Sequence, residues 1–193
     1  IEQYAIGELL DGRYVYIPSY QRGYRWTDKQ VDDLLRDLLC FANDTKDDYD
    51  FYCLQPIIAR PITDEKKLKK LFKDVSIDVL QEKGEWEIID GQQRLTTMYL
   101  VLNQQKSLLE QIYSDMKLFN LSYQSRPDSR QYLENIDSTK SNSNIDYYHM
   151  FNASAVITDF LKKTTLGGWR FVDAIVNANN TESRPSVKFI WYD

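Results

Sequence analysis

The sequence is poor in cysteine and histidine, and it contains no long apolar run. Its two cysteines, Cys40 and Cys53, are too few for a disulfide framework and do not have the spacing of metal ligands. No apolar run approaches the roughly 18 residues that a transmembrane helix needs. Residues 1–10 lack the basic and apolar regions of a signal peptide. We therefore expect a cytoplasmic protein that makes no use of a membrane.

The chain also lacks an excess of basic residues. Its net charge is −5, whereas a protein that grips duplex DNA over a wide face is usually basic. The segment from Asp28 to Asp50 contains eight aspartates and only three basic residues, Lys29, Arg36 and Lys46. We interpret that segment as a solvated helix face and loop, not as a metal site. Any contact with nucleic acid must therefore be local, or must be made by another part of the protein.

The most informative segment is EIIDGQQRLTT, residues Glu87–Thr97. Strand-forming residues run into the turn pair Asp90-Gly91, and the residues from Gln92 onward favour a helix. Free N–H groups and the positive end of the helix dipole make such a junction an anion site. Arg94 adds a guanidinium that suits phosphate oxygens. The pattern predicts a phosphate site, although it is not a Walker motif, because Gly-Lys-Ser and Gly-Lys-Thr are absent from the chain.

Each residue of this junction receives a candidate role. The backbone N–H groups of Gly91, Gln92 and Gln93 would bind phosphate together with the Arg94 side chain. Asp90 would orient water, hold a phosphate-bound Mg²⁺ or cap the helix, and the sequence leaves these roles open. The hydroxyls of Thr96 and Thr97 would contact the ligand or simply cap the helix.

A second motif, YQRGYRW, spans Tyr20–Trp26. Arg22 would form a second cationic arm of the site, and Gln21 would hold a water molecule or a phosphate oxygen. Tyr20 and Tyr24 are expected in the core rather than stacked on a base. Together with the junction, the motif suggests a catalytic set of Asp90, Arg22 and Arg94.

Other polar residues are less informative. Arg126 or Arg130 would reach the same anion, although an exposed arginine is the commoner case. His149 is expected to be a structural residue within a helix.

The pattern of apolar residues predicts an α+β fold with a small mixed β-sheet core, surrounding helices and a helical C-terminal half. Thr27 and Gln30 form a capping box before a helix through Ala42. The chain ends on a strand, which suggests a fragment of a longer protein. The other expected elements are an edge strand at Tyr14–Pro18, a strand at Leu54–Ala59, one amphipathic helix over Asp64–Lys83, a helix from Gln92 to about Tyr113, an irregular segment at Asn120–Asn144, helices at Tyr147–Lys162 and Phe171–Val176, and a strand at Val187–Tyr192.

The two motifs, in this order and separation, resemble the N-terminal domain family of GmrSD-type restriction endonucleases. SRPDSRQYL (Ser125–Leu133), NIDYYHMF (Asn144–Phe151) and VKFIWYD (Val187–Asp193) extend the resemblance over nearly the whole chain. It implies a ParB/sulfiredoxin-like nucleotide-binding core over residues 1–116. A helical extension over residues 117–193 would precede further parts of the protein.

The resemblance implies a module that binds and hydrolyses a nucleoside triphosphate with Mg²⁺, in a phage-defence enzyme that acts on modified DNA. A C-terminal HNH-type nuclease domain or subunit would be its partner, and the single His149 cannot build such a centre. The family's Phe-x-x-x-Asn segment after the last strand is absent here, so the nucleotide site is expected to be incomplete. A sulfiredoxin-like cysteine is replaced by Gln92, and the basic region of ParB proteins has no counterpart.

Two alternatives remain open at the level of sequence. The same pocket would read DNA without hydrolysing a nucleotide, or the chain would be a scaffold that docks a partner nuclease. A homo-oligomer is compatible with either alternative.

Overall fold

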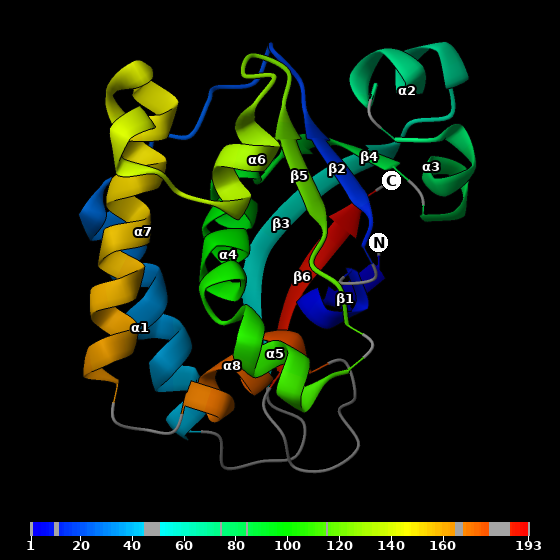
Figure 1. Cartoon of the computed structure of the whole chain (residues 1–193). Coiled ribbons are helices and arrows are strands. Elements are labelled where there is room, and N and C mark those ends of the chain that lie inside the picture. Colours follow the sequence, from blue (N-terminus) through cyan, green and yellow to red (C-terminus); the bar gives the residue numbers. More distant parts are fainter. Residues whose placement is uncertain are drawn as a thin grey trace.

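The computed structural model describes residues 2–9, 12–44, 51–73, 75–83, 85–114, 116–164, 168–177 and 186–192 (Figure 1). Six strands form one mixed sheet in the order β1-β6-β3-β4-β2-β5. The strands are β1 (Glu2–Ala5), β2 (Tyr14–Ile17), β3 (Phe51–Pro61), β4 (Glu85–Asp90), β5 (Asn120–Tyr123) and β6 (Ser186–Tyr192). The helices are η1 (Ile6–Leu9), α1 (Asp28–Asp44), α2 (Glu65–Leu71), α3 (Ile77–Lys83), α4 (Gln92–Gln104), α5 (Lys106–Ile112), α6 (Ser129–Glu134), η2 (Ser138–Ser143), α7 (Ile145–Lys163) and α8 (Gly168–Val176).

The strand directions bring the carboxyl ends of three strands to one edge of the sheet. Strand β2 runs parallel to both β4 and β5, whereas β3 runs antiparallel to β4. The carboxyl ends of β2, β4 and β5 therefore meet at the upper edge in Figure 1, where α4 begins. The α+β fold with a mixed sheet is confirmed.

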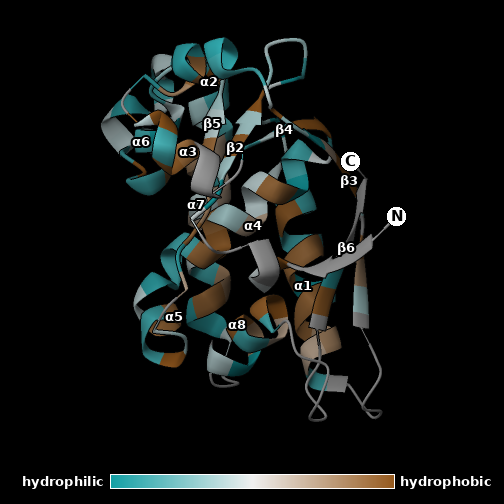
Figure 2. Cartoon of the chain, turned by 90° about the vertical axis from the view of Figure 1, so that its right-hand side faces the viewer, coloured by the Kyte–Doolittle hydropathy of each residue, from teal (hydrophilic) through white to brown (hydrophobic). Residues whose placement is uncertain are grey.

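Helices cover the sheet unevenly. Helices α1, α4 and α7 lie on one side of it, and α2 and α3 lie on the other (Figure 1). The larger core includes the fully buried Leu35, Ile88, Val101, Ile157 and Val172, and Figure 2 shows apolar residues on α1, α4 and α8. A smaller core lies with α2 and α3 and contains Tyr16, Ile62, Leu68, Phe72 and Leu80.

Several predicted elements are confirmed close to their expected bounds. Helix α1 follows Thr27, whose N–H donates to Oε1 of Gln30 at 3.0 Å, one half of the predicted capping box. The strands β3, β4 and β6 and the helices α7 and α8 also lie where the sequence placed them. Among the described helices, none has both the length and the apolar content to cross a bilayer.

The predicted edge position of Tyr14–Pro18 is wrong. Strand β2 lies inside the sheet, with β4 on one side and β5 on the other. Pro18 follows the last residue of the strand, so its missing N–H removes no hydrogen bond from the ladder. The proline therefore marks the end of an inner strand.

The predicted single helix over Asp64–Lys83 is two helices, α2 and α3. Phe72 leaves helical geometry, with φ −122° and ψ 63°, and ends α2. Its ring is buried against Tyr14 and Tyr16, with ring centroids 5.3 and 6.2 Å apart. Packing against the sheet thus overrides the helical periodicity.

Two further expectations need correction. The helix from Gln92 ends at Gln104, and α5 is a separate helix after Gln105. The segment Asn120–Asn144 is ordered as β5, α6 and η2. The proposed division at residue 116 stays a prediction, and β5 and β6 from 117–193 pair directly with strands from 1–116.

Candidate functional site

The junction between β4 and α4 is built around a glycine. Gly91 is the N-cap of α4 and has φ 92°, a left-handed conformation that favours glycine. A Cβ atom there would lie 2.9 Å from Cγ1 and 3.1 Å from Cα of Ile57 on β3. The backbone conformation and the neighbouring strand both select glycine at this position.

The first turn of α4 offers hydrogen-bond donors. The first helical bond runs from the N–H of Leu95 to the carbonyl of Gly91, at 3.1 Å. The preceding N–H groups of Gln92 and Gln93 have no acceptor within the described ranges of the chain. This end of the helix dipole favours a negative charge.

The side chains of the two glutamines hold the Tyr20–Trp26 loop. Oε1 of Gln93 accepts from the backbone N–H of Arg25 at 2.7 Å, and Nε2 of Gln93 donates to the carbonyl of Gly23 at 2.8 Å. Nε2 of Gln92 donates to the carbonyl of Arg22 over 3.4 Å. The two predicted motifs are therefore in direct contact, and the backbone of Arg22 lies at the amino end of α4.

The charged side chains at this junction have different surroundings. Arg22 and Asp90 are exposed, and neither side chain has a hydrogen-bond or ion-pair partner among the residues that the structure describes. Arg94 is half-buried, and its Nη1 donates to the carbonyl of Pro56 over 3.4 Å. Nε2 of Gln21 donates to the carbonyl of Ile89, next to Asp90. Within the described part of the chain, the Asp90 side chain makes no hydrogen bond to the first turn of α4, so the capping role is not the one it has in this structure.

Thr96 and Thr97 are fully buried beneath the junction. The Thr96 hydroxyl donates to the carbonyl of Gln92 at 2.8 Å and lies 2.5 Å from the Tyr123 hydroxyl. The Thr97 hydroxyl lies 2.8 Å from the hydroxyl of Tyr24. Burial raises the pKa of both tyrosines, so their hydroxyls stay neutral. Positioning of the first turn, not ligand contact, is the role that we propose for both threonines.

A buried aspartate from α7 completes the support of the loop. Asp146 has only 2% of its side chain exposed and forms ion pairs with Arg25 and with Arg126, the latter at 2.8 Å. A Cβ atom on Gly23 would lie 2.1 Å from Oδ1 of Asp146. Gly23 thus allows the loop to lie directly on the carboxylate.

Sequence reasoning did not assign a role to Asp146. Its segment, Asn144–Phe151, contributed only to the family resemblance. Arg126 was one of two arginines considered for the ligand anion, and in the structure its side chain forms an ion pair with this carboxylate. His149 lies in α7 beside Tyr148, with ring centroids 5.4 Å apart.

The two motif tyrosines differ from each other. Tyr24 is fully buried, as expected, whereas Tyr20 has 64% of its surface exposed. The predicted core position of Tyr20 is therefore wrong. Its hydroxyl donates to Oε1 of Glu87 at 3.2 Å, so the ring lies over β4 and not within the core.

The donor set at the junction fits a phosphate-bound Mg²⁺. Mg²⁺ often keeps several water ligands and takes one or two carboxylates together with phosphate oxygens. The exposed carboxylate of Asp90 fits that mode. The described part of the chain contains no cluster of three acidic, histidine or cysteine side chains that would bind a metal alone.

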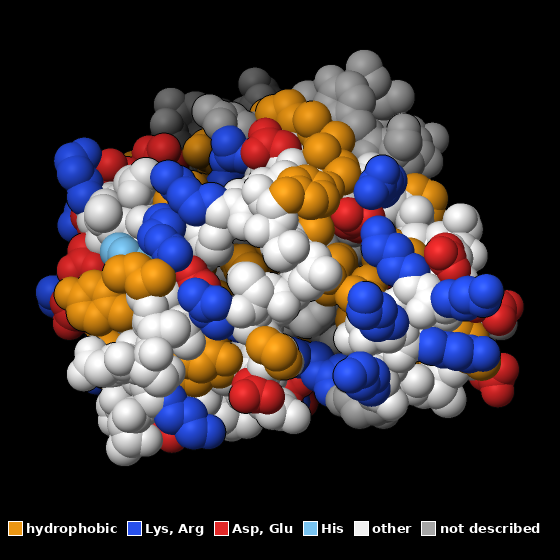
Figure 3. Space-filling model, turned by 90° about the horizontal axis from the view of Figure 1, so that it is seen from above, with side chains coloured by type: hydrophobic (Ala, Val, Ile, Leu, Met, Phe, Trp, Pro, Cys, Tyr) orange, Lys and Arg blue, Asp and Glu red, His pale blue; other side chains and the backbone are white. Residues whose placement is uncertain are grey.

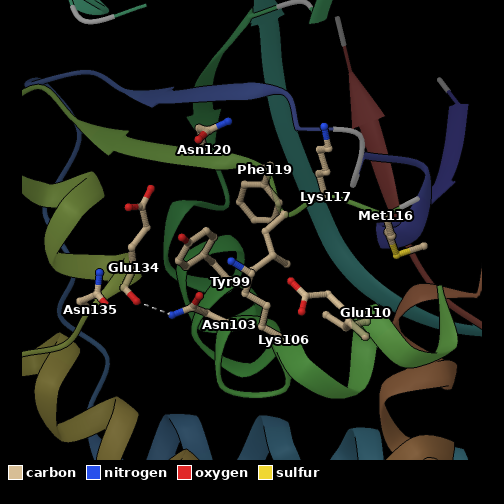
Figure 4. A pocket seen from close by; sticks show the side chains of 12 residues that line it. Tyr99, Asn103, Lys106, Glu110, Met116, Lys117, Phe119, Asn120, Glu134 and Asn135 are labelled. Atoms are coloured by element: carbon tan, nitrogen blue, oxygen red, sulfur yellow. Dashed lines mark hydrogen bonds between the residues drawn. The ribbon is translucent and has the colours of Figure 1, made fainter. Parts of the chain in front are cut away.

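A cavity of about 610 Å³ lies at the far end of α4 from the junction (Figure 4). Tyr99 and Asn103 of α4 line it together with Lys106 of α5 and Phe119. The amide of Asn103 donates to the carbonyls of Leu133 and Glu134, at 3.2 and 3.0 Å. None of the residues of the two motifs lines this cavity.

Comparison with models of protein families gives a match over most of the chain. The model of a protein family described as "GmrSD restriction endonuclease, N-terminal domain" matches residues 6–186. The match covers both motifs and α7. No curated protein matches the chain.

Proposed function

Because the chain belongs to the family of GmrSD restriction endonuclease N-terminal domains, we propose that it is the nucleotide-binding regulatory module of such an enzyme. Its ligand would be a nucleoside triphosphate with Mg²⁺, and its setting would be phage defence against modified DNA. The module would control a nuclease domain or subunit of HNH type. Hydrolysis of the nucleotide is part of the proposal.

One observation carries the proposal. The side chain of Gln93 fastens the loop that carries the exposed Arg22 to the amino end of α4, which directly follows the exposed Asp90. The donors and the guanidinium suit phosphate oxygens, and the carboxylate suits Mg²⁺ or an attacking water. An exposed cation on the loop and an exposed anion at the end of β4 fit a ligand that has both a negative charge and a bound metal.

The chemistry would rest on positioning and charge. Backbone N–H groups and Arg22 would bind the phosphates and stabilise the charge that develops on their oxygens. Arg94 would hold the backbone of β3 at Pro56 and add its positive charge to the site. Asp90 would orient the attacking water or hold the Mg²⁺.

Calorimetry with each nucleoside triphosphate and Mg²⁺ tests the proposal on the full-length protein. Arg22→Ala is the informative variant, because the Arg22 side chain supports nothing else in the described structure. Loss of a charged hydrogen bond should weaken binding by about tenfold to a hundredfold. The matched control is Arg36→Ala, an exposed arginine of α1 paired with Asp32, and it should leave affinity unchanged.

Asp90→Asn separates binding from hydrolysis. Phosphate release should fall by at least about tenfold, because the variant keeps the shape of the side chain and loses its charge. No binding by the wild-type protein would refute the proposal. Binding of modified DNA without phosphate release from any nucleotide would instead support a non-hydrolysing recognition module. Unchanged function of the assembled enzyme after Arg22→Ala would support a scaffold.

A further inference from the structure

The positive charge of the chain is concentrated in one short segment. Residues 60–73 contain six lysines and arginines and two carboxylates, a net charge of +4 in a chain whose net charge is −5. We call its cations the α2 basic surface: Arg60, Lys66, Lys67, Lys69, Lys70 and Lys73. In Figure 3, Lys and Arg side chains gather on the right, over α2.

Helix α2 separates its lysines from its apolar residues. Leu68 is buried in the smaller core, whereas Lys66, Lys69 and Lys70 are exposed. The two carboxylates of the segment itself lie at the amino end of α2. Asp64 caps the helix by accepting from two backbone N–H groups, and Glu65 lies 4.0 Å from Lys69 in an exposed pair, which contributes little.

A buried carboxylate fixes the α2 basic surface to the sheet. Glu87 of β4 has 3% of its side chain exposed and accepts from Nζ of Lys67 at 2.6 Å and from Nε of Arg60 at 3.0 Å. Burial would raise the pKa of Glu87, but the hydrogen bonds from Lys67 and Arg60 outweigh it and hold that pKa below its usual range. Two cations are therefore held in place, and the exposed lysines project from a helix with a fixed position.

The same strand connects this surface to the candidate nucleotide site. Glu87 also accepts from the hydroxyl of Tyr20, in the loop that carries Arg22. Three residues later β4 ends at Asp90. Figure 3 looks onto the edge at which α4 begins, so the α2 basic surface and the junction lie on one face of the protein.

We propose that the α2 basic surface binds the phosphate backbone of double-stranded DNA, at a place separate from the nucleotide site. The choice of DNA as the polyanion rests on the proposed role within a DNA-acting enzyme. A local cluster suits this role, because phosphate neutralisation by lysines supplies affinity without sequence preference. The acidic remainder of the chain limits the contact to this segment.

The test is titration of a fluorescent DNA duplex with the full-length protein at several salt concentrations. The variant carries Lys66→Gln, Lys69→Gln and Lys70→Gln. The control removes the same charge at the other end of the molecule: Lys106→Gln, Lys117→Gln and Lys162→Gln. All six lysines are exposed, and nucleotide affinity is measured by calorimetry on each protein.

The α2 variant should lose DNA affinity on the order of tenfold or more, and the slope of log affinity against log salt should fall by about 2 to 3. The control should keep both the affinity and the slope. Equal effects of the two variants, or no binding of the duplex by the wild-type protein, would overturn the proposal. The nucleotide affinity of the α2 variant should be unchanged. The DNA titration therefore tests the DNA proposal, and calorimetry separately tests the nucleotide proposal.

Discussion

The buried carboxylate of Asp146 allows a quantitative prediction, because one substitution removes its charge and keeps its shape. Asp146→Asn leaves the guanidinium groups of Arg25 and Arg126 without a carboxylate. Breaking a fully buried ion pair in this way costs about 3–5 kcal/mol. The two arginine side chains are 27% and 30% exposed, so water solvates them in part. We therefore expect a loss of about 2–3 kcal/mol in the free energy of unfolding.

A control lies on the same helix. Asp159 pairs with Lys163 at 2.5 Å, but the two side chains are 63% and 74% exposed. Asp159→Asn should therefore cost no more than about 0.5 kcal/mol. Urea unfolding near neutral pH, followed by tryptophan fluorescence, measures both variants against the wild-type protein. Equal stability of the two variants would refute the assignment of a structural role to the buried carboxylate.

The charged side chains of Asp146 and Arg126 should also be coupled in their effect on stability. Arg126→Gln should cost less in the Asp146→Asn background than in the wild-type protein, by about 1–2 kcal/mol, because the interaction is already lost. Nucleotide affinity should fall in Asp146→Asn under conditions in which the protein is still folded, since the loop that carries Arg22 lies on the carboxylate. A fall in stability without any change in affinity would show that the loop keeps its position without Asp146.

Three further substitutions test other contacts. Gly91→Ala should destabilise the protein by about 2 kcal/mol or more, because alanine is strained at this φ and its Cβ would approach β3, and an unchanged urea midpoint would contradict this. Glu85 is buried, and burial raises its pKa to about 7 from 4.5. The folded protein therefore favours the protonated carboxyl, whose contribution to stability is full below pH 4.5 and is lost as pH rises to about 7. Relative to Glu85→Gln, the wild-type protein should lose on the order of 3 kcal/mol over this range, and parallel urea curves at pH 5 and pH 8 would argue against the shift. Gln93→Leu should cost about 2–4 kcal/mol by stranding two backbone groups, whereas Arg22→Ala should change stability by less than about 0.5 kcal/mol in the same assay.

Local patterns made much of the fold predictable from the sequence. Helix α1 was predicted because its apolar stripe and its capping residues lie within one short segment. The turn at Asp90-Gly91 was predicted because only glycine readily adopts the backbone conformation that the junction needs. These features depend on neighbouring residues, and the sequence displays them directly.

Long-range contacts account for the errors. Strand β2 was placed at an edge because nothing near Pro18 indicates that Asn120–Tyr123 would pair beside it. The helix over Asp64–Lys83 was drawn as continuous because the burial of Phe72 under the sheet is a tertiary effect. Asp146 was missed because its partner Arg25 lies 121 residues away in the chain. A charged residue in a helical segment gives no sign of such a partner.

The structure divides the residues of the DGQQR segment into two kinds. The side chains of Gln92 and Gln93 bind the backbone of the Tyr20–Trp26 loop, so they do not face the predicted ligand. Asp90 is exposed, and Arg94 is half-buried against Pro56. From the sequence alone, the backbone N–H groups of Gly91, Gln92 and Gln93 and the side chain of Arg94 were assigned to phosphate, and the two glutamine side chains had no role. In the fold the amides join two segments that lie 68 to 70 residues apart, and the charges and backbone N–H groups are left to bind phosphate. A substitution in this segment therefore tests ligand binding directly only where the side chain does not also hold the Tyr20–Trp26 loop in place.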